Sequence, residues 1–253
     1  MEVERAPPCI VELAGVEARV GSFHLGPVSL ALEAGRVTVV IGPNGGGKTT
    51  LLRLIAGLIP HRGEVRYCGN PAPATPGRGG LVDYVPAEPQ ADPYARVEEL
   101  FKVSGASLDK ARRYFPGLDE FLPRRMRELS SGEEKLVCLL RGIASSRRIL
   151  LLDEPFTHLD VSRQALVLRM LKEEASKGRL IVVAMHELHL LSAIADRVVL
   201  LKDGVKLFDI PPSEIEGYLE VIEEAYDASL ATIETGAGVI LLPSPVDAPG
   251  GES

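Results

Sequence analysis

The sequence predicts an α/β fold built on a mainly parallel sheet that is flanked by helices. Three uninterrupted aliphatic runs, at residues 37–41, 149–152 and 180–184, are typical of strands buried on both faces. Segments of helical periodicity alternate with these strands along the chain. Such alternation is typical of parallel strands that are joined by right-handed crossovers.

The other elements follow in chain order. Residues 10–13, 18–20 and 28–32 are short and alternate in polarity, which predicts an antiparallel β flank beside the main sheet. Helical patterns follow the first aliphatic strand and surround the third, at 48–58, 161–177 and 188–195. The flank and these helices complete the predicted core of the protein.

A helical subdomain is predicted between two parts of the sheet. Residues 71–80, PAPATPGRGG, form a loop by composition. Helical periodicity then dominates 97–143, with breaks at Gly105 and Pro116. The pattern changes again at Pro211, and the chain carries no internal repeat.

These changes in pattern predict a single domain over residues 1–253. Its parts are a core (1–90 and 149–210), an inserted helical subdomain (about 91–148), a C-terminal extension (211–243) and a disordered tail (244–253). The tail is predicted from its lack of apolar residues.

Composition narrows the class of function. The chain has 28 Lys+Arg against 35 Asp+Glu, a net charge of −7, so we expect no nucleic-acid partner. Three scattered cysteines without a CxxC pair exclude a disulfide scaffold and a cysteine zinc site, and they fit a reducing compartment. No apolar run approaches the ~20 residues that cross a bilayer, and the acidic first residues do not resemble a signal peptide. A cytoplasmic protein is expected.

The most specific motif is the run GPNGGGKTT. It satisfies GxxxxGK[ST] between a predicted strand and a predicted helix, as a phosphate-binding P-loop must. Glycines let successive backbone N–H groups face a triphosphate, and the helix N-terminus adds partial positive charge. The predicted nucleotide-binding residues are Gly42, Pro43, Asn44, Gly45, Gly46, Gly47, Lys48, Thr49 and Thr50. The motif therefore predicts a P-loop NTPase core.

Residue types within the loop suggest separate roles. Lys48 would reach the β- and γ-phosphates, and Thr49 would supply a hydroxyl ligand to Mg²⁺. Thr50 would donate to an α-phosphate oxygen. ATP and Mg²⁺ are thus the expected ligands.

A second strand ends in two acids. In ILLLDE, Asp153 is placed to hold Mg²⁺ and Glu154 to polarise an attacking water. Upstream, LSSGEE at 129–134 opens a helical run and offers a second anion site. Taken alone, this second feature is better explained as an ordinary helix cap.

Together these motifs resemble the ATP-binding cassette (ABC) family over residues 3–243. The ordered set is GPNGGGKTT at 42–50, LSSGE at 129–133, ILLLDEP at 149–155, THLD at 157–160, and His186. The resemblance implies a head-to-tail homodimer that holds ATP between one P-loop and the partner's LSSGE signature.

The resemblance also implies roles for residues outside the P-loop. Ser130, Ser131 and Gly132 would contact the γ-phosphate in trans, and Asp160 would lie in the loop that joins the two sites. His186 would contact the γ-phosphate as a switch histidine. Lys48, Glu154 and His186 form the expected catalytic set.

Three positions depart from the family pattern. Ser131 replaces a glycine of the signature, and Val20 stands where an aromatic residue stacks on adenine, with Phe23 nearby as a substitute. Ala87 stands where the family's Q-loop carries a glutamine. In the family this glutamine usually helps to ligate Mg²⁺ and links the site to the membrane partner. Another water on Mg²⁺, Gln90 or Glu88 could take over that role, or hydrolysis could be slow. Because Glu154 and His186 are retained, we predict an active ATPase.

Size and the C-terminal extension favour one branch of the family. A single cassette without membrane helices resembles the ATPase subunit of an importer, and residues 212–243 resemble those of metal-chelate, siderophore and cobalamin systems. This implies a membrane permease, docked near residues 87–94, with indirect contact to a substrate-binding protein. The subunit would be peripheral on the inner face of the membrane. The alternatives are a soluble cassette of iron–sulfur assembly and a catalytically weak regulatory cassette.

Overall fold

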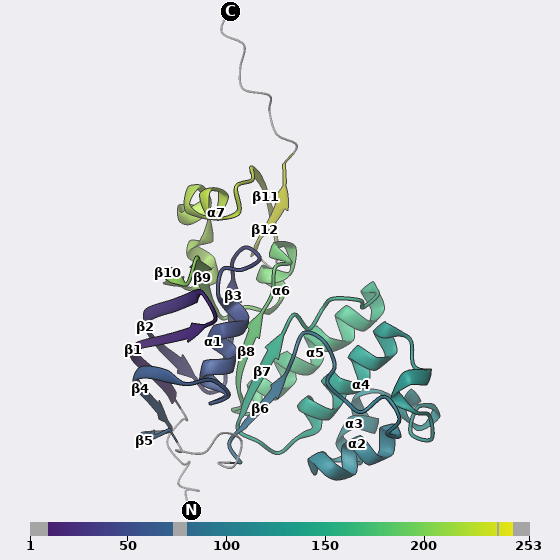
Figure 1. Cartoon of the computed structure of the whole chain (residues 1–253). Coiled ribbons are helices and arrows are strands. Elements are labelled where there is room, and N and C mark those ends of the chain that lie inside the picture. The colour runs from purple at the N-terminus through teal and green to yellow at the C-terminus, as the bar shows by residue number, and fades with distance from the viewer. Residues whose placement is uncertain (1–9, 73–79, 237, 245–253) are drawn as a thin grey trace, which may run out of the picture.

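A six-stranded, mainly parallel sheet forms the centre of the computed structural model, which describes residues 10–72, 80–236 and 238–244 (Figure 1). Its strand order is β10-β9-β3-β8-β7-β6, with only β10 antiparallel to its neighbour. The strands are β3 (Val37–Ile41), β6 (Val82–Val85), β7 (Ile149–Asp153), β8 (Leu180–Ala184), β9 (Arg197–Lys202) and β10 (Val205–Ile210). The predicted α/β class and its three aliphatic strands are confirmed.

A separate antiparallel sheet lies beside this centre, as predicted. Its order is β2-β1-β4-β5, formed by β1 (Ile10–Val20), β2 (Phe23–Glu33), β4 (His61–Tyr67) and β5 (Asn70–Pro71). The two short segments predicted at 10–13 and 18–20 are one strand. They looked separate because the pairing shifts register between Leu13 and Ala18, where Gly15 has a positive φ of 56°.

The core helices begin where expected and end slightly earlier. They are α1 (Lys48–Ile55) and α5 (Val161–Ser176). The predicted helix at 188–195 is a short 3₁₀ turn, η3 (Leu188–Leu190), followed by α6 (Leu191–Ile194). Helix α1 stops before 58 because Gly57 takes a positive φ of 69°.

Between β6 and β7 the chain is helical (Figure 1). The elements are α2 (Val97–Ser104), α3 (Leu108–Tyr114), η1 (Pro116–Glu120), η2 (Met126–Glu128) and α4 (Ser131–Ala144). Gly105 ends α2 in a left-handed conformation, and Pro116 starts η1, so both predicted breaks occur.

The C-terminal segment lies above β9 and β10 in Figure 1. It comprises η4 (Pro212–Tyr218), α7 (Leu219–Tyr226), β11 (Leu230–Thr235) and β12 (Gly238–Pro243), the last two paired antiparallel. Residues 245–253 of the predicted tail, and 73–79 of the predicted 71–80 loop, lie outside the described residues. No helix in the described ranges is long and apolar enough to span a bilayer.

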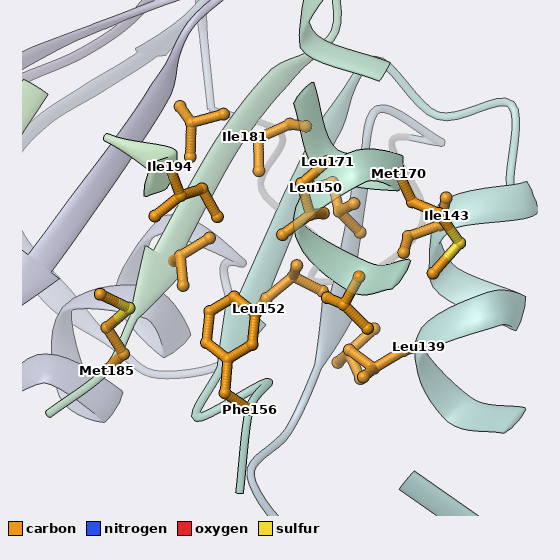
Figure 2. Close-up of a cluster of buried hydrophobic side chains, with 14 of the residues drawn as sticks. Leu139, Ile143, Leu150, Leu152, Phe156, Met170, Leu171, Ile181, Met185 and Ile194 are labelled. Atoms are coloured by element: carbon orange, nitrogen blue, oxygen red, sulfur yellow. The ribbon is translucent and has the colours of Figure 1, made fainter. Parts of the chain in front are cut away.

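Both faces of the central sheet are covered, which explains the unbroken aliphatic runs. Leu150 and Leu152 of β7 point to the side of α4 and α5, where Figure 2 shows them with Phe156 and Leu171. Leu151, between them, faces the opposite side, toward α1. A strand buried on both faces needs apolar residues at every position.

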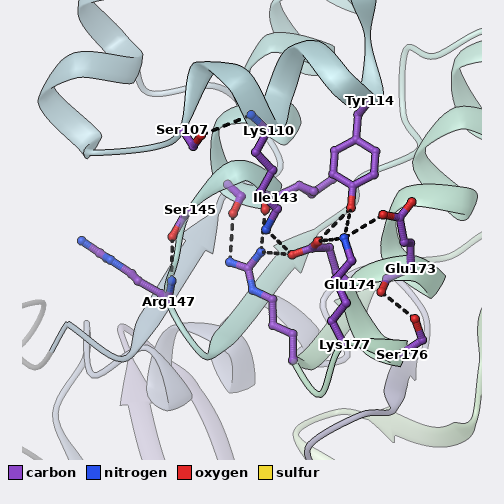
Figure 3. A network of polar contacts seen from close by, with 12 residues as sticks. Ser107, Lys110, Tyr114, Ile143, Ser145, Arg147, Glu173, Glu174, Ser176 and Lys177 are labelled. Carbon is purple, nitrogen blue, oxygen red and sulfur yellow. Dashed lines mark hydrogen bonds and ion pairs between the residues drawn. The ribbon is translucent and has the colours of Figure 1, made fainter.

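A buried carboxylate ties α3 to α5 (Figure 3). Glu174 of α5 is 3% exposed and accepts hydrogen bonds from Tyr114 (2.8 Å) and Lys177 (3.1 Å), and it also pairs with Lys110 of α3. Burial alone would raise the pKa of Glu174, but the hydrogen bonds from Lys110, Tyr114 and Lys177 bring it below the ordinary value. Arg179 adds an ion pair at 3.4 Å.

The cysteines differ from one another. Cys138 is a buried free thiol, whereas Cys68 is disulfide-bonded. The wide spacing of the cysteines did not predict this bond. Because disulfides are rare in reducing compartments, Cys68 does not support the expected reducing compartment.

Candidate nucleotide-binding site

The glycine-rich loop runs from the end of β3 to the start of α1 and wraps around a buried lysine. Lys48 Nζ donates to the carbonyl oxygens of Gly42 (2.8 Å) and Pro43 (3.2 Å). Burial lowers the pKa of Lys48, while Glu154 and Asp153 act in the opposite direction. The lysine is therefore held inside the loop, with two acids close by.

Two glycines of the loop are favoured by a positive φ, and one of them is also required by packing. At Gly42 (φ 148°), a Cβ atom would lie 2.0 Å from the Leu201 carbonyl oxygen. At Gly47 (φ 106°), it would lie 3.1 Å from Cζ of Phe23, a side-chain atom. Gly42 is therefore fixed by both space and backbone conformation, and Gly47 by backbone conformation.

Beside the loop, a hydroxyl and a carboxylate meet. Thr49 Oγ1 donates to Asp153 Oδ1 at 3.1 Å, and Tyr84 donates to the other carboxylate oxygen, also at 3.1 Å. Burial, followed by the nearby Asp153, raises the pKa of Tyr84 to about 12, so its phenol is protonated near neutral pH. Hydroxyl and carboxylate oxygens are the ligands that Mg²⁺ prefers, so this donor set fits Mg²⁺.

Glu154 lies between two basic side chains. One carboxylate oxygen is 3.7 Å from Lys48 Nζ, and the other is 2.7 Å from His186 Nδ1. Burial raises the pKa of Glu154, while His186 and Lys48 partly offset this. Glu154 has a positive φ of 46°, an uncommon conformation for a non-glycine residue. The backbone is thus turned so that this side chain faces the loop.

A pocket of about 440 Å³ opens over the loop. Its lining is Val20, Phe23, Asn44, Gly45, Gly46, Gly47, Lys48, Thr49, Thr50 and Glu154. Val20, at the expected adenine position, is 42% exposed, and Phe23 accompanies it. The pocket therefore combines the apolar side chains of Val20 and Phe23 with the glycine-rich loop.

The signature residues lie elsewhere in the chain and do not line this pocket. Ser130 caps α4, where its hydroxyl accepts from Glu133 N at 3.3 Å while Glu133 accepts from Ser130 N at 2.8 Å. A Cβ at Gly132 would lie 2.6 Å from the His158 carbonyl oxygen, so the start of α4 packs on the 157–160 loop. Asp160 caps α5 by accepting from Arg163 N at 2.9 Å.

Ser131, also in this cap, is exposed at the first turn of α4. Within one chain, the structure thus brings Ser130, Ser131, Gly132 and Asp160 to one region and the P-loop pocket to another.

Motifs did not indicate a buried lysine next to the Q-loop. Lys135 of α4 is 1% exposed, and its Nζ donates to the carbonyl oxygens of Ala87 (2.6 Å), Asp153 (3.3 Å) and Pro86 (3.5 Å). It links α4, the strand end that carries Asp153, and the segment that contains Ala87, where the sequence led us to expect the Q-loop. Its position just after LSSGEE was the only signal in the sequence.

Replacing Lys135 with Met is expected to lower the free energy of unfolding by about 1–3 kcal/mol, because buried carbonyls lose their donor. Urea denaturation would measure this change. The control is Lys102→Met on α2, whose side chain is exposed, and it should stay within about 0.5 kcal/mol of wild type. Equal stability of the two variants would contradict the assigned role of Lys135.

The fold and site define a class. Strand β3 of the parallel sheet leads through GPNGGGKTT into α1, and Asp153 ends β7, two strands away in the sheet. This arrangement is typical of a P-loop nucleotide-binding protein.

Comparison with known proteins defines the family. The ABC transporter family model matches residues 25–157, and the chain belongs to this family. The chain is 36% identical over 218 residues to the hemin import ATP-binding protein HmuV of Streptomyces coelicolor, covering 79% of this chain and 76% of the relative. It is 33% identical over 224 residues to the manganese transport system ATP-binding protein MntB of Listeria monocytogenes, covering 81% and 90%.

Solved structures share the fold. An ATP-binding subunit of an ABC transporter has a TM-score of 0.73 at 22% identity, covering 84% of this chain and 94% of its own. A transporter described as of the metal-chelate type has a TM-score of 0.74 at 19% identity, covering 94% of this chain and 98% of its own.

The family model and the relatives together identify the protein as an ATP-binding import subunit of an ABC transporter, an ATPase coupled to transport.

Proposed function

We propose that this ATPase powers uptake of a metal chelate of the hemin type through a separate membrane permease. The observation that carries the hydrolytic part is the position of Glu154, which lines the P-loop pocket with Lys48 and contacts both Lys48 and His186. The cargo class is supported by the similarity to hemin import subunits of several bacteria. Manganese is the second candidate, because similar subunits serve manganese transport.

The proposed chemistry assigns one task to each side chain. Backbone N–H groups of the loop and the N-terminus of α1 bind the phosphates, and Lys48 leaves the loop carbonyls to neutralise phosphate charge. Glu154 accepts a proton from the attacking water, and His186 fixes the orientation of that carboxylate through the 2.7 Å contact. Thr49 and Asp153 would hold Mg²⁺, which offsets phosphate charge when bound.

A second copy of the chain is proposed to complete the site. Ser130, Ser131 and Gly132 do not line the P-loop pocket of their own chain. In a head-to-tail homodimer they would contact the γ-phosphate bound by the partner, with Asp160 near the joint. Closure of such a dimer around ATP favours one conformation of the attached permease, and hydrolysis releases it.

The apolar end of the pocket is proposed to receive adenine. Val20 and Phe23 both line it, so Phe23 supplies the aromatic surface that Val20 lacks. The presence of Phe23 in the lining supports adenine binding although Val20 is not aromatic. At Ala87, Lys135 Nζ holds the backbone by donating to its carbonyl oxygen at 2.6 Å.

The cargo is tested with the reconstituted importer. The subunit is purified with its permease in nanodiscs, on the proposed inner face, together with the substrate-binding protein. Hemin-loaded binding protein should stimulate phosphate release several-fold, whereas manganese-loaded protein should not. Stimulation by manganese alone would transfer the proposal to the second candidate. Failure to purify with any permease would instead favour the iron–sulfur assembly or regulatory alternatives.

A further inference from the structure

One hydroxyl group of the C-terminal segment contacts the P-loop directly. The Gly42 N–H donates to the Tyr226 hydroxyl at 2.8 Å, across 184 positions of sequence. Tyr226 ends α7 and lies outside residues 25–157, which the family model matches. We infer that Tyr226 is a positioning residue for nucleotide binding, which holds Gly42 and thereby the resting position of Lys48.

The phenol is delivered by an anchored helix. Ile222 and Ala225 share the face of α7 that carries Tyr226, and both are buried. At the end of β9, Lys202 Nζ donates to the Glu224 carbonyl oxygen at 2.8 Å. Packing on one face and a hydrogen bond on the backbone therefore fix where the Tyr226 hydroxyl lies.

Gly42 has little freedom of its own. Its α-carbon lies so close to the Leu201 carbonyl that an added Cβ would be only 2.0 Å from that oxygen. Its N–H is held by Tyr226, and its carbonyl oxygen accepts from Lys48 Nζ at 2.8 Å. Loss of the Tyr226 contact would leave the N–H of Gly42, the residue on which Lys48 rests, without this acceptor.

The contact is that of a neutral phenol. Burial raises the pKa of Tyr226, and the nearby Glu154 and Glu187 act in the same direction, so the hydroxyl stays protonated near neutral pH. Its oxygen can therefore accept from Gly42 without placing a negative charge beside the phosphate site.

The same segment also contacts the chain that follows His186. Strand β12 packs on η3 and α6, with Leu241 buried in that contact region. The C-terminal segment thus touches the P-loop through α7 and the chain after the histidine through β12. The inference deepens the proposed function and depends on the P-loop pocket being the ATP site.

The test is Tyr226→Phe, which removes the hydroxyl and keeps the ring. Affinity is measured by titrating purified protein with a fluorescent ATP analogue in the absence of Mg²⁺. We expect about tenfold weaker binding, because the loop without its acceptor is less often in the binding conformation. In the ATPase assay, KM for ATP should rise by a similar factor, while kcat changes less than about twofold.

The control is Tyr218→Phe, in the same segment, whose ring packs on Phe208 and which should bind like wild type. Hydrogen exchange separates positioning from folding, because only the loop at 42–47 should exchange faster in Tyr226→Phe. Wild-type affinity in Tyr226→Phe, or faster exchange throughout the chain, would overturn the inference. If wild type itself failed to bind the analogue, the proposed function would fail first.

Discussion

Replacing Glu154 with Gln is expected to slow ATP hydrolysis by about 10²–10⁴-fold while nucleotide binding stays close to wild type. Glutamine keeps the shape of the side chain but cannot accept a proton from water. Two neighbouring groups support the role of Glu154 as the proton acceptor, since its carboxylate contacts both Lys48 (3.7 Å) and His186 (2.7 Å). Phosphate release in saturating Mg²⁺-ATP, measured with the permease present, gives the rate.

Glu187 provides a matched control for this change. It also lies near His186, 3.7 Å from Nε2, but it does not line the P-loop pocket. Glu187→Gln should therefore lower the rate by less than about tenfold. If Glu154→Gln kept more than a tenth of the wild-type rate, or if both variants were equally slow, Glu154 would not be the proton acceptor.

Replacing Glu174 with Gln should lower the free energy of unfolding by about 3–5 kcal/mol, a large part of the stability of an ordinary domain. The carboxylate is 3% exposed, and its loss leaves Lys110 and the 7% exposed Arg179 without their buried counter-charge. Urea denaturation at neutral pH would measure the change.

The neighbouring residue offers the control. Glu173 pairs with Lys177 at 2.7 Å, but both side chains are about half exposed. Glu173→Gln should therefore change the stability by less than about 1 kcal/mol. Equal losses in the two variants would contradict the importance of the buried network.

The same site predicts a dependence on pH. Because the pKa of Glu174 is lowered by folding, its contribution is present above the unfolded pKa and is lost as pH falls through the folded pKa. Wild type should thus lose its advantage over Glu174→Gln below about pH 4.5, near the ordinary value of a glutamate. A difference that stayed constant to pH 3 would contradict this linkage.

The sequence predicts the central strands well because burial on both faces leaves a strong signal. The runs at 37–41 and 180–184 carry only residues that suit this environment. Strand β9, RVVLLK, was not predicted, because a charged residue at each end obscures its apolar centre. Strand β6 is short and includes a buried acid, Asp83, which is uncommon in such strands.

The site was predictable only where a motif carries it. GPNGGGKTT and DE have spacings that few other functions require, so the P-loop and its facing acids could be located. Tyr84, Lys135 and Tyr226 are ordinary residue types with no motif. Their roles arise from contacts across 69, 48 and 184 positions, which only the folded chain brings together.

The central claim is that two copies of the chain enclose ATP between one P-loop and the partner's Ser130–Gly132. Light scattering on Glu154→Gln with saturating Mg²⁺-ATP tests it most directly, because this variant should bind ATP without hydrolysing it. The account predicts a particle of twice the mass of one chain, which returns to one chain when Ser131→Arg is added to the variant. A single-chain particle, at an ATP concentration that a binding assay shows to be saturating, would contradict the account.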